Sequence, residues 1–406
     1  MHRMFRTMNS VLLGSAAVAL FVTTASGQAP SILGAPSEAN HFIETPKGWV
    51  HPKTPWGDPD IQGMFSFSYV GTVGLERCAG GGRPGGPPCD PNKAWLTDEE
   101  YKQRVDAALG RGDAARQLIE QGNYGRALLS GVTDPTFPQR QTSLIVDPPN
   151  GRLPELTPEG KRRGAEMRSS WALPGERLTF DWVTDFDSWD RCITRGMPSS
   201  MFPYRYNNGL RIMQAPGMVV LDLEMIHESR IVYTDGRPPI PSTIKHYMGE
   251  SRGHWEGNTL VVITTNYKEG PSGTNIGVAG SPQGNRWPVS DQMKTTERFT
   301  RLNNDMWLYE IKTEDPVIMT RPYTVRFPMR NDPSYDWWEY ACHEGNSVIP
   351  NYVTTSRFER ANPQPPAAPE APGAGGGRGG RGQGGGAATP APQTPPVPVG
   401  QGGRGN

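Results

Sequence analysis

The stretch RIMQAPGMVVLDLEMIHESRIVYTDG, residues 211–236, decides the fold class. Apolar residues stand at 219, 221, 223 and 225 and alternate with Asp222 and Glu224, a period of two that indicates a strand with one polar face. Pro216-Gly217 and Asp235-Gly236 are turn signals that interrupt and end the run. The stretch therefore predicts short strands at 211–215, 218–227 and 230–234, joined by tight turns.

The two acidic residues of the second strand allow two interpretations. In a one-sided antiparallel sheet these carboxylates face water. In a barrel they would instead line a polar interior, compensated by Glu297, Arg298, Glu310 and Arg326. The sequence leaves both interpretations open.

The same alternation recurs along most of the chain. Further strands are predicted at 61–70, 259–267, 295–302, 306–314, 322–329 and 337–342, and Asn303-Asn304-Asp305 is a hairpin signal. Seven or eight short antiparallel strands predict a mainly β fold, a meander closed into a barrel or folded as a sandwich. We favour a barrel of calycin type, because Gly63-Met-Phe65 resembles the Gly-x-aromatic element that plugs one end of lipocalin-like barrels.

Helices interrupt the strand pattern. Thr97 followed by Asp98-Glu99-Glu100 is typical of an N-cap with an acidic first turn, and Thr157-Pro158 predicts a second, shorter helix. We therefore expect one β-rich domain over residues 40–360, with a helical insertion over 97–170.

The two ends of the chain differ in composition from the domain. Basic residues precede an apolar run from Val11 to Val22, and the small residues Ala25, Ser26 and Gly27 follow it, which predicts a cleavable secretory signal over residues 1–27. The alternative, an uncleaved anchor, is disfavoured because the run is short for a bilayer-spanning helix. Residues 361–406 are rich in Pro, Gly and Arg and predict a disordered tail. We therefore expect a periplasmic or secreted protein without a membrane span.

The charge balance and the motifs limit the classes of partner and cofactor that the sequence predicts. Lys plus Arg and Asp plus Glu both number 41, so no net field attracts nucleic acid or an anionic membrane. The sequence has no P-loop signature and no H-E-x-x-H motif, and its glycine-rich loop between positions 78 and 89 lacks the flanking strand and helix of a dinucleotide-binding fingerprint. We expect no cofactor and no nucleic-acid partner, which leaves a small-molecule ligand or substrate.

The four cysteines of an exported chain predict two disulfides. Three pairings are possible. We expect Cys78 to pair with Cys89, because the Gly/Pro-rich loop between them needs its ends tied, and this leaves Cys192 to pair with Cys342.

Seven segments resemble, in the same order, a large family of exported bacterial proteins. They are RQTSLIVDPPNGR (140–152), WDRCITRG (189–196), YNNG (206–209), QAPG (214–217), HWEGNTLVV (254–262), ERFTR (297–301) and YACHEGN (340–346). The resemblance covers nearly the whole chain between signal and tail, apart from the glycine loop. It implies a signal peptide and one β-rich domain and brings no activity with it.

The best candidate for chemistry follows the last predicted strand, at His343 and Glu344. A disulfide between positions 192 and 342 would bring a second polar segment, residues 190–195, close to them. A histidine beside carboxylates and guanidiniums is how a general base is tuned and an oxyanion held. Under this hypothesis the catalytic residues are His343, Glu344, Asp190 and Arg195, and the ligand contacts are Arg191, Trp338, Tyr340 and Asn346. The alternative is an ion-pair network without catalysis.

A weaker alternative concerns His254 and Glu256. At positions i and i+2 of a strand both side chains point the same way, as two metal ligands would. Gly257-Asn258 follows, so both side chains could instead lie in solvent at a hairpin tip.

Three function classes remain. The first is an exported β-barrel that binds a small apolar or aromatic molecule, favoured by the many tryptophans and tyrosines of the β region. The second is a cofactor-free hydrolase or isomerase that uses His343 and Glu344. The third is a structural envelope protein. Whether the protein is an enzyme is open at this point.

Overall fold

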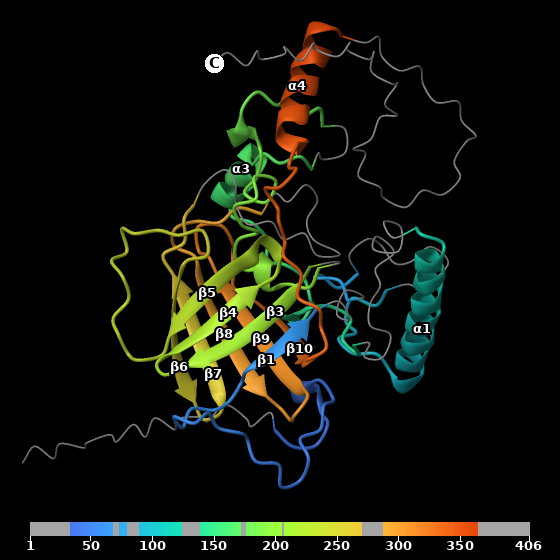
Figure 1. Cartoon of the computed structure of the whole chain (residues 1–406), viewed down its shortest axis with the longest axis vertical. Coiled ribbons are helices and arrows are strands. Elements are labelled where there is room, and N and C mark those ends of the chain that lie inside the picture. Colours follow the sequence, from blue (N-terminus) through green and yellow to red (C-terminus); the bar gives the residue numbers. More distant parts are fainter. Residues whose placement is uncertain are drawn as a thin grey trace, which may run out of the picture.

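Ten strands form one curled sheet with the shape of a half-barrel in the computed structural model of the chain (Figure 1). The structure describes residues 33–67, 73–78, 89–123, 139–171, 176–204, 207–269 and 287–363. The strands are β1 (Gly63–Ser66), β2 (Ile145–Asp147), β3 (Gly209–Ala215), β4 (Met218–Leu223), β5 (Glu228–Tyr233), β6 (Glu250–Glu256), β7 (Thr259–Thr265), β8 (Lys294–Arg301), β9 (Met306–Glu314) and β10 (Tyr323–Arg330). The predicted mainly β class is confirmed. The predicted signal, the glycine loop and nearly all of the predicted tail lie outside the described residues.

The sheet order is β1-β3-β4-β5-β6-β7-β8-β9-β10-β2. Neighbouring strands are antiparallel except β5 and β6, which pair in parallel. At the β1 edge Phe65 forms an isolated bridge with Asn331, just after β10, and the Met64 N–H donates to the Asn331 side-chain carbonyl at 3.0 Å. The sheet therefore curls until its first strand reaches the end of β10.

Within the described ranges, three α-helices accompany the sheet. Thr97 caps α1 (Asp98–Glu120) with a capping box to Glu100, and Thr157 caps α3 (Pro158–Glu166), as predicted. The third helix, α4 (Val348–Ala361), was not predicted, since no side chain caps it and Pro350 stands in its first turn. In Figure 1, α1 lies beside the sheet, whereas α3 and α4 lie together beyond one end of it. None of the helices within the described ranges is long and apolar enough to cross a bilayer.

Two strand predictions are wrong. Residues 337–342 are irregular, because Trp337 packs under the Arg211 guanidinium and the Trp338 N–H donates to Glu224 at the end of the sheet. The strand predicted at 218–227 ends at Leu223, and a 3-10 turn (Met225–His227) follows it. Two short or irregularly paired strands, β2 and the start of β6, were also missed, and β2 belongs to the insertion that was expected to be helical.

The concave side of the sheet is filled by aromatic side chains. Phe65 packs edge-on against Trp307 with ring centroids 5.1 Å apart, and Tyr309 packs against Phe299 at 5.0 Å and Phe327 at 5.3 Å. All five side chains are fully buried. Such ring contacts supply much of the burial energy of a core.

The short parallel pairing between β5 and β6 is reinforced by side chains. The ladder there has only two residue pairs. Arg230 of β5 reaches across it and donates to Glu297 of β8 at 2.5 and 3.0 Å, and to Ser251 and Thr264 at 3.3 Å. The Tyr309 hydroxyl donates to the same Glu297 carboxylate at 2.9 Å. A buried ion pair therefore joins strands that few backbone hydrogen bonds join.

Candidate functional site

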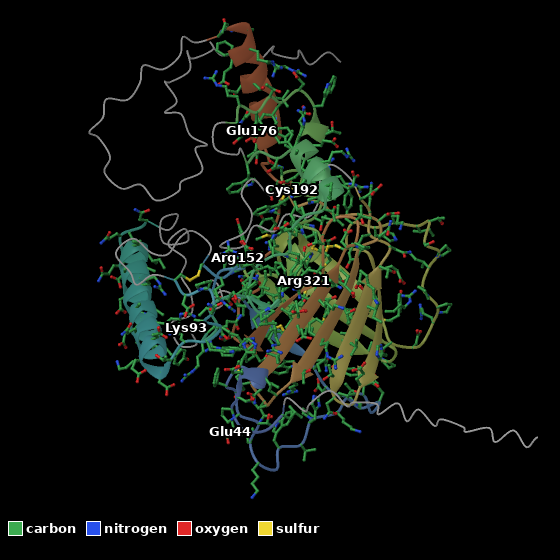
Figure 2. The ribbon with its side chains drawn as sticks, turned by 180° about the vertical axis from the view of Figure 1, so that it is seen from behind. Glu44, Lys93, Arg152, Glu176, Cys192 and Arg321 are labelled. Carbon is green, nitrogen blue, oxygen red and sulfur yellow. A yellow bond between two sulfur atoms is a disulfide. The ribbon has the colours of Figure 1, made fainter. Side chains whose placement is uncertain are left out.

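A disulfide ties the end of the sheet that carries β4–β5 to the C-terminal segment. Both disulfides are as predicted, Cys78–Cys89 and Cys192–Cys342. Around the second one, the side-chain amide of Asn346 donates to the Asp190 carbonyl, and the imidazole of His227 hydrogen-bonds to the Tyr340 carbonyl at 2.9 Å. We call this region the tethered end, made of residues 187–204, 207–209, 224–228 and 332–347. Figure 2 shows Cys192 above the sheet, on the side where α3 and α4 lie.

Backbone strain concentrates at the tethered end. Among the described residues, four of the eight non-glycine residues with positive φ lie there, namely Cys192, Asn207, Ile226 and His227, with φ between 40° and 64°. A left-handed conformation is unfavourable for a β-branched residue such as Ile226. Strain of this kind is typical of functional sites, where surrounding contacts hold the backbone in place.

Glu224 is the contact that anchors the C-terminal segment. Its carboxylate is fully buried and accepts hydrogen bonds from the Gly209 N–H and the Asn207 amide at 3.0 Å, from the Tyr335 hydroxyl at 2.5 Å and from the Trp338 N–H at 3.3 Å. Burial, together with this carboxylate, raises the pKa of Tyr335. The hydroxyl of Tyr335 therefore stays a donor, and Glu224 serves a structural role.

Arg195, a predicted catalytic residue, is buried within aromatic rings. Its guanidinium lies over the ring of Tyr204 at 4.7 Å and that of Trp189 at 5.5 Å. It also lines a cavity of about 10 Å³ with Ser200 and Asn207. That volume holds about one water molecule. Arg195 is therefore buried at the tethered end and packs against two aromatic rings.

Asp190, also predicted as catalytic, is one of two neighbouring aspartates that are each hydrogen-bonded to a serine. Its carboxylate accepts from the Ser170 N–H at 2.9 Å and the Ser170 hydroxyl at 2.7 Å. The neighbouring Asp187 is buried, accepts from the Asp190 N–H at 2.8 Å and is hydrogen-bonded by the Ser169 hydroxyl. Burial, and then the charge of Asp190, raise the pKa of Asp187 to about 6. These bonds join the 187–192 turn to the segment after α3.

Beside this pair lies an open groove of about 340 Å³. Residues 165–169, 176–180 and Asp185 line it. Met167, Ser169 and Phe180 are its buried members, whereas the charged residues on its rim are exposed or half-buried. Figure 2 shows Glu176, one of the rim residues, near α4 at this end of the molecule. The recess lies within the size range of small-molecule sites.

Helix α4 supports the groove from behind. The ring of Phe180 stacks on Phe186 at 4.6 Å and packs edge-on against Tyr352 of α4 at 5.3 Å. The Phe180 N–H donates to the Ser356 hydroxyl of α4 at 2.9 Å. The groove therefore depends on a helix that the sequence did not predict.

The rim is organised by a salt bridge. The Arg168 guanidinium donates to Asp185 at 3.1 Å and to the Thr179 carbonyl at 3.4 Å. Burial works in the opposite direction, but the N–H groups of Asp181 and Trp182 and the charge of Arg168 hold the pKa of Asp185 below its usual value. Asp185 is therefore an ionised acceptor at the rim.

His343 and Glu344 are placed differently from the expected catalytic pair. Both side chains are exposed, and within the described part of the chain neither makes a hydrogen bond or an ion pair. Their neighbours Tyr340 and Asn346 make the contacts with His227 and Asp190 described above. The disulfide brings the two predicted segments together without forming a base–acid contact between them.

The remaining predicted residues make structural contacts. Arg191 donates to the Asp187 carbonyl at 3.2 Å. His254 and Glu256 lie 3.3 Å apart on the outer face, and Arg298 donates to Glu256 at 2.9 Å and lowers its pKa. No group of three metal-binding side chains occurs among the described residues.

The sequence prediction missed the residues of the groove. Only one local signal was present, the Asp187-Ser-x-Asp190 pattern, which is typical of a turn closed by side-chain hydrogen bonds.

Comparison with known proteins adds no assignment: no family model matches the sequence, and no curated protein or solved structure matches it.

Proposed function

We propose that this protein binds a small molecule in the groove beside the tethered end. The observation that carries the proposal is the groove itself, with its buried apolar members Met167 and Phe180 and its charged rim. Small-molecule sites combine an apolar surface with a few placed polar groups in this way. The rim supplies Asp185 as an acceptor and Arg168 as a donor.

The groove is a better location for a ligand than the concave side of the sheet. Aromatic side chains such as Trp307 and Tyr309 occupy that side and are fully buried. A ligand there would have to displace core rings, which costs several kcal/mol for each large side chain, roughly the cost of its removal. The ligand expected from the sequence to lie inside a barrel is therefore proposed to lie at its end.

The compartment belongs to the same proposal. Two disulfides indicate an oxidising environment. Together with the N-terminal signal pattern, they favour a periplasmic or secreted protein. Edman sequencing of protein from the periplasmic fraction is expected to begin after Ala25 or Gly27. An intact N-terminus with reduced cysteines in the cytoplasmic fraction would contradict this part.

The binding proposal is tested by filling the groove. Thr179 lines the groove and is exposed, whereas Thr184, five residues further on, is also exposed but is not among the lining residues. Native mass spectrometry of protein purified from its own host is expected to show a retained ligand in the wild type and in Thr184→Trp. In Thr179→Trp the retained fraction is expected to fall at least about tenfold, the change produced by about 1.4 kcal/mol.

Both variants should melt within about 2 °C of the wild type, because exposed substitutions change stability little. Retention of the ligand by Thr179→Trp, or absence of any ligand from the wild type, would refute the proposal.

A further inference from the structure

Exposed aromatic side chains gather at the end of the molecule that holds the groove. Of the exposed tryptophan and phenylalanine side chains among the described residues, four lie at this end: Trp171, Trp182, Trp338 and Phe358. The fifth, Trp56, belongs to the N-terminal lead-in, drawn in blue in Figure 1 at the opposite end of the sheet. Monomeric proteins rarely expose several large rings together unless the surface binds something.

Backbone hydrogen bonds join two of these tryptophans to residues that line the groove. The Trp171 N–H donates to the Ser169 hydroxyl at 3.1 Å, and the Trp182 N–H donates to the Asp185 carboxylate at 2.9 Å. Ser169 and Asp185 both line the groove. The ring of Trp182 is 70% exposed and that of Trp171 is 46% exposed. Both tryptophans therefore stand two or three residues from a groove-lining residue, within reach of a ligand that extends beyond the groove.

The polar groups of the rim favour a ligand with many hydroxyls. Glu166, Glu176 and Asp185 are acceptors, and Arg168 and Arg177 are donors, so the rim carries three carboxylates and two guanidiniums. Arg162 pairs with Glu166 at 2.6 Å, so the charges at the rim balance and do not favour an anion such as a fatty acid. A neutral ligand that both donates and accepts hydrogen bonds is matched by such a mixed rim.

Resting on the proposed function, we propose that the ligand of the groove is a neutral saccharide. The C–H face of a pyranose ring carries a weak positive charge and stacks on the negative face of an indole, while its hydroxyls bond to carboxylates and guanidiniums. The groove and its two flanking tryptophans supply both kinds of contact. The Arg357 guanidinium lies over one face of the Trp182 ring, 5.9 Å from its centroid, which leaves the other face to the sugar.

The test uses the mature chain and named probes. Isothermal titration and a glycan array are run with cellohexaose, maltohexaose, chitohexaose and purified peptidoglycan sacculi. At least one probe is expected to bind, and Trp182→Ala and Trp171→Ala are each expected to weaken that binding by about tenfold. Trp56→Ala removes an exposed tryptophan at the other end and is expected to leave the affinity unchanged.

The outcomes separate this proposal from the one it rests on. If native mass spectrometry finds a retained ligand that is not a saccharide, and Thr179→Trp removes it, the saccharide assignment is overturned and the groove remains a binding site. If a probe binds but both tryptophan variants bind it like the wild type, the saccharide site lies elsewhere and this proposal fails. If no probe binds and no ligand is retained, both proposals fail.

Discussion

Replacing Glu297 with glutamine is expected to destabilise the fold by about 3–5 kcal/mol. The change leaves the Arg230 guanidinium, whose side chain is 2% exposed, without a charged partner. Burial alone would lower the pKa of Arg230, but the Glu297 carboxylate more than offsets this and raises it, so Arg230 keeps its charge. An isolated charge in such a place costs several kcal/mol.

The magnitude follows from the contacts that the substitution removes. Glu297 accepts two hydrogen bonds from Arg230 and one from Tyr309. Glutamine has the same shape but one acceptor oxygen, so it retains at most part of this set. Because the pair closes a seam with only two ladder pairs, no nearby backbone bonds compensate the loss.

The assay is equilibrium unfolding in urea with both disulfides intact, for the two single variants Glu297→Gln and Arg230→Met and for the double variant. The double variant removes the charge together with its partner, so it is expected to be less destabilised than the sum of the singles by at least about 2 kcal/mol. A matched surface pair, Asp147–Arg321, is half-exposed on both sides, and Arg321→Gln is expected to cost less than about 0.5 kcal/mol.

The reasoning is refuted if Glu297→Gln stays within about 1 kcal/mol of the wild type, or if the two substitutions are additive. Either result would mean that water reaches the pair or that the seam is held by other contacts.

Three further predictions follow from the tethered end. The pKa of Asp187 is raised to about 6, so the native state binds a proton that the unfolded chain releases above about pH 4. The free energy of unfolding, measured in urea, should therefore rise as the pH falls from 7 to 5. The Asp187→Asn variant should be about 1–3 kcal/mol more stable than the wild type at pH 7 and should not show this rise. A wild-type stability that does not change between pH 7 and 5 would contradict the prediction. Removing the Cys192–Cys342 disulfide, whose cysteines are 150 residues apart, should cost about 5 kcal/mol of stability. Removing Cys78–Cys89, whose cysteines are 11 residues apart, should cost about 3 kcal/mol. Equal urea midpoints for the two double Cys→Ser variants, one for each disulfide, would disprove this ordering. His343→Ala should leave the melting temperature unchanged because the side chain is exposed and without contacts among the described residues, and a loss of ester or glycoside turnover in that variant would favour the hydrolase hypothesis.

The parts of the fold that the sequence predicted are those with local signals. The caps at Thr97 and Thr157 were predicted correctly because a side chain and a backbone N–H three residues on are enough to form them. The long strands β7, β8 and β9 follow from alternation and the turn between the last two.

The parts that were missed depend on distant contacts. The parallel pairing of β5 with β6 is set by the segment between them, which has no pattern of its own. Residues 337–342 have the composition of a strand, but Glu224 and Arg211 hold their backbone and rings in an irregular path. Propensity describes a segment alone, and here tertiary contacts override it.

The sequence predicted only the part of the candidate site that the Cys192–Cys342 disulfide brings together. Pairing Cys192 with Cys342 placed Asp190 and Asn346 in one region, which the structure bears out. The groove was not predictable, because Ser169 and Asp187 are 18 residues apart in a stretch without strand alternation. Their hydrogen bond depends on the three-dimensional path of the chain.

The question of where the acidic residues point is settled by the parity of the strands. Asp222 alternates with the buried Val219–Leu223 positions and lies outside, where it accepts from Arg211 and Ser229. Glu297 and Arg298 are successive residues of β8, so their side chains point to opposite faces of the sheet. Glu297 lies in the interior, and Arg298 pairs with Glu256 on the outside.

Glu224 follows neither rule, since it stands after the last residue of β4. Alternation therefore predicts the face of a side chain only within a strand. On the concave face of this sheet it places the aromatic rings and the Arg230–Glu297 ion pair, which stabilise the fold. A binding surface has to come from the segments after the strands end, where backbone and side chains take paths that the core does not dictate. The groove, Asp187 and both tryptophans lie in such segments, so the proposed binding surface lies at the end of the sheet.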